Sequence, residues 1–388
     1  MNAKTTTITR EALVERHQIP LLPPHPDLET RKVLKALTIA HKNLAELKGR
    51  AGSIPNQGIL IDTLMLQEAA ASSEIENIVT TQDELFQIDS RKGIYPSPEA
   101  KEVGMYGEAL RLGYSQLVEK DGMISSNQII ALFQTLKGST DEFRKMPGTA
   151  LKNESSGEIV YVPPQSHSDI LDQMRALERF INTTEETDLD PLVSMALIHH
   201  QFESIHPFSD GNGRIGRILN VLYLCRVELL EIPILYISRY ITRNKGEYYR
   251  LLQHTRDTLE WEPWLLYMIN AVSETAKETT QLVFGIKQLM SEYKNRIKRD
   301  HPKLYSHELV NNLFRHPYTR IEYVIEEVGV GRQTAGRYLD QLTQSGLLEK
   351  VKVAQSNYYI NAPLVQLLSQ NGPEPRQSGP KNKLRDQS

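Results

Sequence analysis

The sequence has little of what marks membrane, secreted or nucleic-acid-coating proteins. It contains one cysteine in 388 residues, so no internal disulfide can form, and we expect Cys225 to be a core thiol on an apolar helix. No stretch approaches the roughly 18 apolar residues of a membrane-spanning helix. The N-terminus, Met1 to Thr5, is polar and no apolar run follows it. We therefore expect a soluble, cytoplasmic protein with no membrane partner.

The sequence has no large excess of positive or of negative charge. The 45 lysines and arginines face 48 aspartates and glutamates, which gives a net charge of −3 and an isoelectric point near 6.4. Such a chain has no overall field that would recruit nucleic acid or an anionic membrane. We find no internal repeat of useful length, and 388 residues suffice for two or three domains.

Twelve consecutive residues, from His206 to Arg217, combine an imidazole, a carboxylate, three glycines, an amide and two arginines. Before them, Asp190 and Pro191 are typical of a helix start, as N-cap and first helical residue. Apolar residues at three- and four-residue spacing continue this helix, and Pro207 predicts its end. His206 is thus expected at a junction between helix and loop, where a side chain can face a cleft.

The glycine-rich turn from Gly211 to Gly213 allows positive φ angles, and a second helix is expected from Arg214 to Val227. A turn that leads into a helix N-terminus directs backbone N–H groups and the positive end of the helix dipole toward one point. Arg214 and Arg217 are three residues apart and share a face of the first turn. Together these features predict an anion site sized for a di- or triphosphate.

The remaining residues of the run suggest chemistry at that site. Asp210 would be out of place beside cationic groups unless a cation lay between it and the phosphates, and Mg²⁺ binds in this way. His206 is suited to act as general base for a hydroxyl that attacks phosphorus. Phe208 is expected to turn inward and anchor the loop. Each residue alone has a structural explanation, as a core histidine or a surface charge, but the whole set does not.

The run resembles the signature of the Fic (filamentation induced by cAMP) family, His-Pro-Phe-x-Asp/Glu-Gly-Asn-Gly/Lys-Arg-x-x-Arg, at every defined position. The resemblance implies a mainly α-helical Fic core that transfers AMP from ATP to a hydroxyl side chain of a target protein. His206 would deprotonate that hydroxyl and Asp210 would hold Mg²⁺. Lysine at the position of Gly213 is typical of family members that resemble kinases. The residues expected to bind ATP within the run are Gly211, Asn212, Gly213, Arg214, Ile215, Gly216 and Arg217.

Helical patterns also occur in the sequence before the 206–217 run. After a polar and proline-rich lead-in (1–25), we expect helices over 27–47, 60–77, 100–120, 125–137 and 166–182. A β-rich stretch near 153–162 predicts a short hairpin. By resemblance this is the flap that docks the target by strand addition, with Ile159, Val160, Tyr161 and Val162 as its docking residues.

The helix over 60–77 ends in Ser72-Ser73-Glu74-Ile75-Glu76-Asn77. Ser72 and Glu76 share a face, and Asn77 suits the left-handed conformation that closes a helix. Alone, such a string is typical of a solvated helix face. Beside the signature it is similar to the family's inhibitory motif, which implies that Glu76 competes with ATP for Arg217 through bidentate pairing.

A tyrosine pair lies farther along, in Glu247-Tyr248-Tyr249-Arg250, before Trp264. This stretch resembles the adenine-side helix of the family. We expect Tyr249 to line the nucleotide pocket and the other tyrosine and Trp264 to belong to the core.

After Lys287 a charged stretch (293–302) suggests a domain boundary. The segment from Ser306 to Ala362 then predicts three helices and a β-hairpin, which is the pattern of a winged helix-turn-helix domain. Residues 301–362 carry seven basic against six acidic residues, which does not favour DNA binding, since that requires several basic groups. A protein-docking or dimer-stabilising role is the preferred alternative. Residues 369–388 are expected to be disordered.

The predicted organisation is therefore an N-terminal helical region with the inhibitory helix (1–100), a Fic core (101–287), a winged-helix domain (300–365) and a tail (369–388). We expect an adenylyltransferase that uses ATP and Mg²⁺ and is restrained by Glu76. Removal of AMP from a modified target, and a DNA-binding regulator that senses nucleotide, are the alternatives. ATP and a protein with a reactive hydroxyl are the expected partners, with self-modification, a homodimer and DNA as further candidates.

Overall fold

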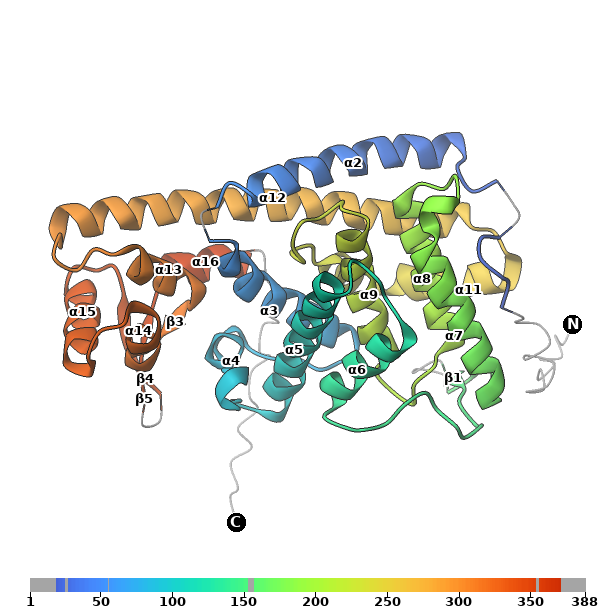
Figure 1. Cartoon of the computed structure of the whole chain (residues 1–388), viewed down its shortest axis with the longest axis horizontal. Coiled ribbons are helices and arrows are strands. Elements are labelled where there is room, and N and C mark those ends of the chain that lie inside the picture. Colours follow the sequence, from blue (N-terminus) through green and yellow to red (C-terminus); the bar gives the residue numbers. More distant parts are fainter. Residues whose placement is uncertain (1–18, 25–26, 55, 153–156, 354–355, 371–388) are drawn as a thin grey trace, which may run out of the picture.

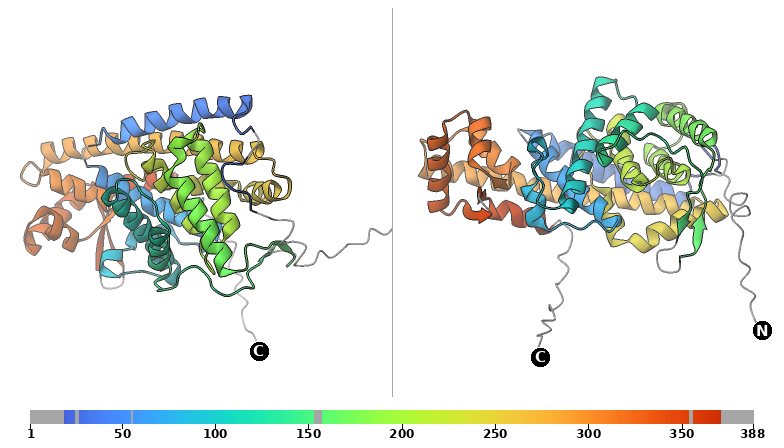
Figure 2. Two further views of the ribbon diagram at one scale, coloured as in Figure 1. Left: turned by 45° about the vertical axis from the view of Figure 1, so that its right-hand side comes forward. Right: turned by 90° about the horizontal axis from the view of Figure 1, so that it is seen from below.

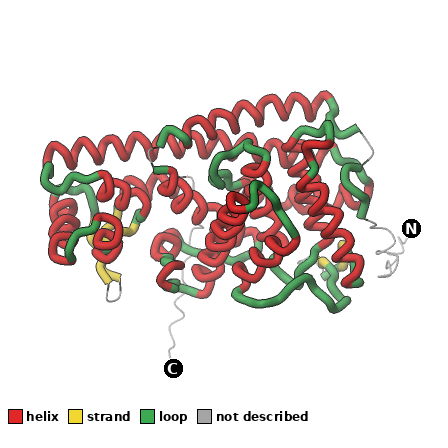
Figure 3. Tube along the Cα trace, viewed as in Figure 1, coloured by secondary structure: helices red, strands yellow, loops and turns green. Residues whose placement is uncertain are grey.

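A computed structural model describes residues 19–24, 27–54, 56–152, 157–353 and 356–370. Helices form most of the described chain, and strands are confined to two small antiparallel sheets (Figures 1 and 3). The predicted lead-in up to residue 18 and the tail from residue 371 lie outside the described residues. None of the described helices is long and apolar enough to cross a membrane.

Two long helices, α2 (Arg31–Ala51) and α12 (Glu262–Asp300), run side by side along one edge of the molecule (Figure 1). α2 begins at Thr30, whose hydroxyl caps Val33 N–H, and it buries residues at three- and four-residue spacing against α12. The apolar spacing from which the helix over 27–47 is predicted includes Leu34, Leu37, Ala40, Leu44 and Leu47. All of these are buried except Leu34, which is 49% exposed, and Val33 takes the buried position instead.

The predicted boundary after Lys287 falls inside a helix, because α12 continues through it as one helix of 39 residues. Its charged second half still contains buried apolar residues, among them Tyr293 and Ile297. The Tyr293 hydroxyl donates to the Leu347 carbonyl at 2.7 Å and to Asn361 Oδ1 at 2.8 Å. The charged composition therefore reflects a helix that is solvated on one side and carries the C-terminal domain on the other.

Under these two helices lie the helices of the N-terminal region and the core. They are α3 (Gln57–Ile75), α4 (Gln82–Gln87), α5 (Pro98–Glu119), α6 (Ser126–Lys137), α7 (His167–Asn182), α8 (Pro191–Ile205), α9 (Asn212–Arg226), α10 (Ile237–Arg243) and α11 (Lys245–Thr258), with short 3₁₀ turns η1 (Ser90–Lys92) and η2 (Thr184–Glu186). The five helices predicted up to residue 182 are present, and α4 and α10 are additional. α8 starts as predicted, with Asp190 capping Leu192 N–H at 2.8 Å.

The predicted hairpin is present as β1 (Leu151–Lys152) and β2 (Ile159–Tyr161), which pair antiparallel with Leu151 opposite Tyr161. The connecting residues 153–156 lie outside the described residues.

The C-terminal domain has the predicted order of elements. It consists of α13 (His307–Arg315), β3 (Tyr318–Thr319), α14 (Ile321–Val328), α15 (Arg332–Gln344), β4 (Glu349–Val353) and β5 (Ser356–Ile360), with strand order β3-β5-β4. One further helix, α16 (Ala362–Gln370), was not predicted. It packs on α12, where Leu367 lies against Gly285, so the start of the tail at residue 369 is wrong. Figure 2 shows this domain at one end of α12, next to the blue and cyan segments of the N-terminal region.

The packing of α5 against α6 and α9 generates a stability prediction. A methyl group at Gly113 would lie 2.6 Å from Leu222 Cδ1 and 3.0 Å from Leu132 Cδ2, whereas one at Gly107 on the same helix would meet no atom within 4 Å. We expect Gly113→Ala to lower the free energy of unfolding by about 1–3 kcal/mol through overpacking. Gly107→Ala should raise it by up to about 1 kcal/mol through helix propensity. Denaturant unfolding of both variants measures this, and equal effects would contradict the packing described.

Candidate active site

His206 caps the C-terminus of α8 in the left-handed conformation, with φ 50° and ψ 58°. The helix ends there as predicted from Pro207. The backbone N–H of His206 still donates to the Phe202 carbonyl at 3.0 Å, and the His206 carbonyl accepts from Arg144 Nε at 2.9 Å. A non-glycine residue in this region of φ is strained, so the surrounding hydrogen bonds hold His206 at the junction.

The surroundings keep the His206 imidazole neutral. Burial lowers the pKa of His206 most, and the charges of Arg256 and Arg144 lower it further, to about 3. The Glu203 carbonyl and the Asp210 carboxylate oppose this shift by less. A neutral imidazole at physiological pH can accept a proton, which is what a general base requires.

Arg144 and Arg256 are functional candidates that the sequence analysis missed. Arg144, 7% exposed, reaches the carbonyls of His206 and Pro164. Arg256 donates to Ser204 Oγ and to the Glu203 carbonyl, both at 3.1 Å, and its guanidinium carbon lies 4.0 Å from the centre of the Tyr161 ring. Both arginines thus join His206 or its helix to the chain around the hairpin.

The turn before α9 is built differently from the prediction. Within 211–213 only Gly211 has a positive φ, of 79°, and the helix already starts at Asn212. The Asn212 side chain accepts from the N–H of Phe208 and donates to its carbonyl, both at 2.9 Å. The side-chain amide thus closes the turn, and an anion at the start of α9 would be met by backbone N–H groups of the first turn, that of Asn212 among them. Phe208 is fully buried, stacked on Phe133 as expected of an anchor.

The next residues of the run divide between the site and the core. A methyl group at Gly213 would lie 2.5 Å from Glu76 Oε1, so this glycine lets a carboxylate approach the first turn of α9. Ile215 is fully buried in the core. Gly216 faces α8, where a methyl group would lie 3.0 Å from Glu203 Oε1 and 3.2 Å from Phe202. Neither Ile215 nor Gly216 therefore offers a side chain to a nucleotide.

The two arginines of the run have separate partners rather than forming one clamp in this structure. Arg214 Nη1 lies 2.5 Å from Glu102 Oε2 on α5. Arg217 faces α3, where its Nε donates to Ser72 Oγ at 2.8 Å and its Nη2 donates to the Ser72 carbonyl at 3.0 Å and to Glu76 Oε1 at 2.7 Å. Both guanidinium groups are almost wholly buried, 2% and 1% exposed.

The structure therefore brings together the predicted trio of Ser72, Glu76 and Arg217 across 141 residues of sequence. Only one oxygen of Glu76 pairs with Arg217 by a hydrogen bond, and Ser72 supplies the other contacts. Burial alone would lower the pKa of Arg217, but Glu76 raises it above the usual value, so this side chain is charged. Glu76 is the C-cap of α3, and Asn77 follows in the left-handed conformation that was predicted, with φ 61°.

A second buried carboxyl fixes α3 farther from its end. Glu68 accepts from the Tyr106 hydroxyl at 3.0 Å and from the Ser238 N–H at 3.2 Å, as well as from the Ser238 hydroxyl. Burial raises the pKa of Glu68 to about 7, although these hydrogen bonds and Arg217 lower it. Burial likewise raises the pKa of Glu203 on α8 to about 7. Neither carboxyl was singled out by the sequence analysis, because buried acids have no local sequence pattern.

Asp210, the predicted Mg²⁺ ligand, lies at the turn with its carboxylate largely exposed. Its Oδ2 is 2.8 Å from Lys137 Nζ. Burial would raise the pKa of Asp210, but the Lys137 hydrogen bond and charge lower it below the usual value. No cluster of three or more metal-ligating side chains occurs among the described residues. A single carboxylate can hold Mg²⁺ only if the phosphates of a nucleotide supply further ligands. This is the usual arrangement for Mg²⁺ in nucleotide sites.

Of the tyrosine pair, Tyr248 belongs to the core as predicted, together with Trp264, whereas the place of Tyr249 in a nucleotide pocket stays a prediction. Tyr248 is buried, and its hydroxyl lies 2.8 Å from His199 Nε2, next to Trp264, which is also buried. Tyr249 is 46% exposed on the outer side of α11.

The hairpin residues do not share one environment. Val160 is 36% exposed, whereas Tyr161 and Val162 are 1% and 2% exposed. The Tyr161 hydroxyl donates to the Ser204 carbonyl at 2.8 Å. Within the described part of the chain, β2 pairs with β1 alone in a two-stranded sheet. The side chains of Tyr161 and Val162 therefore anchor the hairpin to the core. Docking of a target on this hairpin by strand addition stays a prediction.

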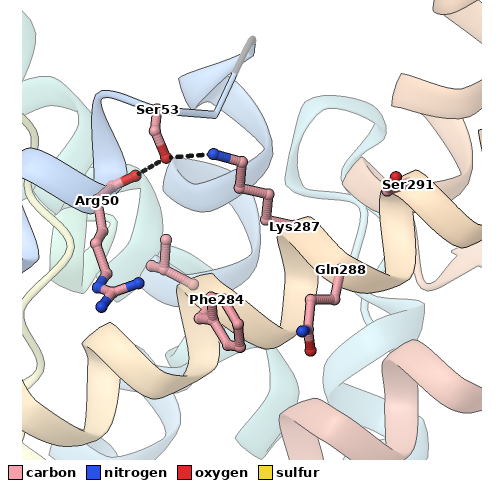
Figure 4. A pocket seen from close by; sticks show the side chains of 7 residues that line it. Arg50, Ser53, Phe284, Lys287, Gln288 and Ser291 are labelled. Carbon is pink, nitrogen blue, oxygen red and sulfur yellow. Dashed lines mark hydrogen bonds between the residues drawn. The ribbon is translucent and has the colours of Figure 1, made fainter.

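A cavity of about 290 Å³ lies elsewhere, between the end of α2 and α12 (Figure 4). Lys287 Nζ donates to Ser53 Oγ at 3.0 Å across it, and Arg50 lies over the Phe284 ring. No residue of the 206–217 run lines this cavity.

The electrostatics of His206 yield a prediction that needs no substrate. We expect the His206 imidazole not to titrate between pH 5 and 8, because its pKa of about 3 lies below that range. Arg256→Gln removes a charge that lowers this pKa, so the pKa of His206 should move up toward the ordinary histidine value of 6.5. NMR titration of the imidazole C–H signals, assigned with His206→Ala, measures both. A midpoint near 6.5 in the unaltered protein would contradict a neutral, buried imidazole.

Three family models match the chain: "Fic/DOC family N-terminal" over residues 34–115, "Fic/DOC family" over 123–224 and "Protein adenylyltransferase SoFic-like, C-terminal domain" over 289–364. Among curated proteins, the chain is 29% identical over 195 residues to a protein of Nematostella vectensis named "Protein adenylyltransferase Fic", covering 49% of this chain and 44% of that one. It is 29% identical over 189 residues to a "Probable protein adenylyltransferase" of Aquifex aeolicus, covering 47% and 54%. The matches thus span about half the length of these curated relatives.

Solved structures show the same fold. A Fic family protein from Desulfovibrio desulfuricans superimposes with a TM-score of 0.53 at 21% identity, covering 87% of this chain and 98% of that one. A segment of Fic-1 from C. elegans gives a TM-score of 0.50 at 21% identity, covering 65% and 71%. With the signature at 206–217 seated between α8 and α9, the chain belongs to the Fic/DOC family.

Proposed function

We propose that this protein transfers AMP from ATP to a hydroxyl group of a target protein. The observation that carries the proposal is the arrangement of a neutral His206 beside the N-terminus of α9, whose first turn adjoins the buried Arg217. A base, backbone donors and a cation within one unit match what nucleotidyl transfer needs. The names of the curated relatives point to the same activity.

In the proposed reaction, the target hydroxyl oxygen forms a bond to the α-phosphorus of ATP as the bond from that phosphorus to the β-phosphate oxygen breaks. His206 accepts the hydroxyl proton, and pyrophosphate leaves. The free N–H groups at the start of α9, from Asn212 to Arg214, face the phosphates, and Arg217 pairs with the distal one. Tyr249 lies on the adenine side.

Asp210 would hold Mg²⁺ against the phosphates, after its carboxylate separates from Lys137. The ion would supply charge neutralisation for the polyphosphate. Lys137, once released, would itself be a cation next to the phosphates.

Restraint by Glu76 belongs to the same proposal. Arg217 Nη2 cannot pair with a phosphate while it pairs with Glu76 Oε1 at 2.7 Å. Glu76 Oε1 also lies where a methyl group on Gly213 would stand, so the carboxylate takes up room beside the first turn of α9. Breaking a buried ion pair typically costs roughly 3–5 kcal/mol, and the cost here is at the low end because the Glu76 side chain is 34% exposed. ATP would then bind without its γ-phosphate on Arg217.

For the target we propose that β2 accepts an extended segment through backbone hydrogen bonds, as a third strand on the side away from β1. Ile159 and Val160 are the hairpin side chains exposed enough to contact it, whereas Tyr161 and Val162 hold the strand in place. Such strand addition tolerates different target sequences.

Incubation with ATP labelled at the α-phosphate tests the proposal. We expect weak incorporation of label into protein by the unaltered chain and at least tenfold more by Glu76→Gly, because Arg217 is released. Glu76→Gln, which keeps the shape but removes the charge, should give an intermediate rate. His206→Ala should abolish incorporation in either background.

Each alternative gives a different result in the same experiment. Transfer of label from the γ-phosphate would identify a kinase. Loss of label from a modified protein on addition of this chain would indicate that it removes AMP. A salt-dependent shift of duplex DNA without any transfer would favour the nucleotide-sensing regulator. Failure of Glu76→Gly to transfer AMP would contradict the inhibitory role of Glu76.

Gly213→Ala provides a test that changes neither member of the ion pair. The new methyl group would stand 2.5 Å from Glu76 Oε1 and 2.9 Å from Arg217 Nη1, so the carboxylate must move away. We expect α-label incorporation above that of the unaltered chain. In the Glu76→Gly background the clash with the carboxylate is gone and only the close approach to Arg217 Nη1 remains, so the same substitution should not raise incorporation further. An increase in both backgrounds would show that Gly213 acts on the reaction by another route.

A further inference from the structure

The C-terminal domain contacts the stretch of chain that follows Glu76. The Tyr318 hydroxyl donates to Asp83 Oδ1 at 2.5 Å, and the Tyr323 hydroxyl donates to Asp89 Oδ2 at 2.8 Å. Asp89 is 7% exposed and its other oxygen caps the turn η1 through Lys92 N–H. Each tyrosine thus ends in a charge-assisted hydrogen bond to the segment 82–92.

Packing and ion pairs add to these two hydrogen bonds. The rings of Phe86 and Tyr318 stack with centroids 5.7 Å apart. Lys92 Nζ lies 2.7 Å from Glu326 Oε1 and 5.0 Å from the centre of the Tyr323 ring. The contact is therefore a mixed aromatic and charged interface rather than a single point.

The same domain also holds the other end of α3. Arg315 Nε lies 3.2 Å from Asp62 Oδ2, and its Nη2 lies 3.0 Å from where a methyl group on Gly58 would stand. Asp62 receives a second arginine, Arg111 of α5, at 3.2 Å. The first turns of α3 are thus fixed between α5 and the C-terminal domain.

Glu76 lies between these two contact regions, 14 residues after Asp62 and 7 before Asp83. We propose that the C-terminal domain is a clamp that holds α3 and the segment after it, and so keeps Glu76 on Arg217. The inference rests on the proposed function, because the clamp matters only if Glu76 restrains the reaction.

The physical reason is that Glu76 lies beyond the contacts that fix the middle of α3 through Glu68 and Ser72. It is the C-cap of the helix, its side chain is 34% exposed, and the next residue turns the chain away in a left-handed conformation. A rigid helix held at its first turns, followed by a segment held by two tyrosines, cannot move its end away from α9 without breaking one of these contacts. The clamp and the Glu76 pair are therefore energetically coupled.

The double variant Tyr318→Phe/Tyr323→Phe tests the clamp in the full-length chain. It keeps both rings and removes both hydroxyl bonds to Asp83 and Asp89. Since each such bond is worth roughly a factor of ten in an equilibrium constant, we expect α-label incorporation to rise about tenfold or more in the chain with Glu76 intact. In the Glu76→Gly background the double variant should change nothing, because there is no pair left to hold.

Tyr359→Phe is the matched control. It removes a hydroxyl that donates to Asp340 at 3.1 Å, a bond internal to the C-terminal domain. We expect it to leave incorporation at the level of the unaltered chain. A rise equal to that of the double variant would show that loosening of the domain in general is responsible, and would overturn the proposal.

Hydrogen exchange separates failure of the clamp from failure of the proposed function. In the double variant, and not in Tyr359→Phe, amides of α3 and of residues 82–92 should exchange faster. If Glu76→Gly is active but the double variant matches the unaltered chain in labelling and exchange, the clamp is overturned. If Glu76→Gly is inactive, the proposed function fails and the exchange result alone decides whether the clamp exists.

Discussion

The buried charge of Arg217 is the constraint on which the rest of the site depends. A guanidinium 1% exposed must be met by hydrogen-bond acceptors and an anion, because an unpaired buried charge is strongly unfavourable. Ser72 supplies two acceptors and Glu76 supplies the anion, both from α3. α3 must therefore pack against α9 for the fold to satisfy Arg217. The Glu76 carboxylate can leave Arg217 at low cost only when another anion takes its place. In the proposed reaction that anion is a phosphate of the substrate. Glu76 and the substrate are thus, in that proposed reaction, alternative partners for one charge.

Burial and neighbouring charges also decide the state of His206, but here they disfavour a positive charge instead of requiring one. Two buried or half-buried arginines, Arg144 and Arg256, flank its helix, and they donate hydrogen bonds to backbone carbonyls and to the Ser204 hydroxyl. Their charges are thus met largely by carbonyl dipoles, including that of His206 itself. The field that results disfavours a second positive charge, so the imidazole stays neutral and the proton it accepts during reaction is only weakly held. The same two arginines contact the Pro164 carbonyl and the Tyr161 ring, so the edge on which a target would dock and the base that would act on it are held by shared side chains.

Much of the fold and site could be predicted because their signals are local. Asp190-Pro191, Pro207 and Asn77 act through caps and backbone conformations that need no knowledge of the tertiary structure, and each occurs where expected. The pairing of Glu76 with Arg217 came from a resemblance, since no local pattern joins residues 141 apart. Arg144, Glu102, Lys137 and the clamp residues of the C-terminal domain were missed because they act only through tertiary neighbours. The continuity of α12 was missed because a run of charges is equally typical of a linker and of a solvated helix face. The hydrogen bonds of the Asn212 side chain to the Phe208 backbone could not be foreseen, because an amide that closes a turn and one that binds phosphate look alike in sequence.

Gly213 shows how one residue can have two physical explanations with different consequences. The first explanation concerns the reaction. Glycine leaves the first turn of α9 without the cationic side chain that a lysine, typical of family members resembling kinases, would place there. As a matter of space, glycine is what permits Glu76 to approach, because any Cβ there would lie 2.5 Å from its carboxylate. The second explanation is the more restrictive. A lysine at this position would meet Glu76 and Arg217 at once, and its ammonium group would compete with Arg217 for the carboxylate. A chain that keeps the Glu76 carboxylate on Arg217 in this position is therefore limited to glycine at residue 213, whatever group it transfers.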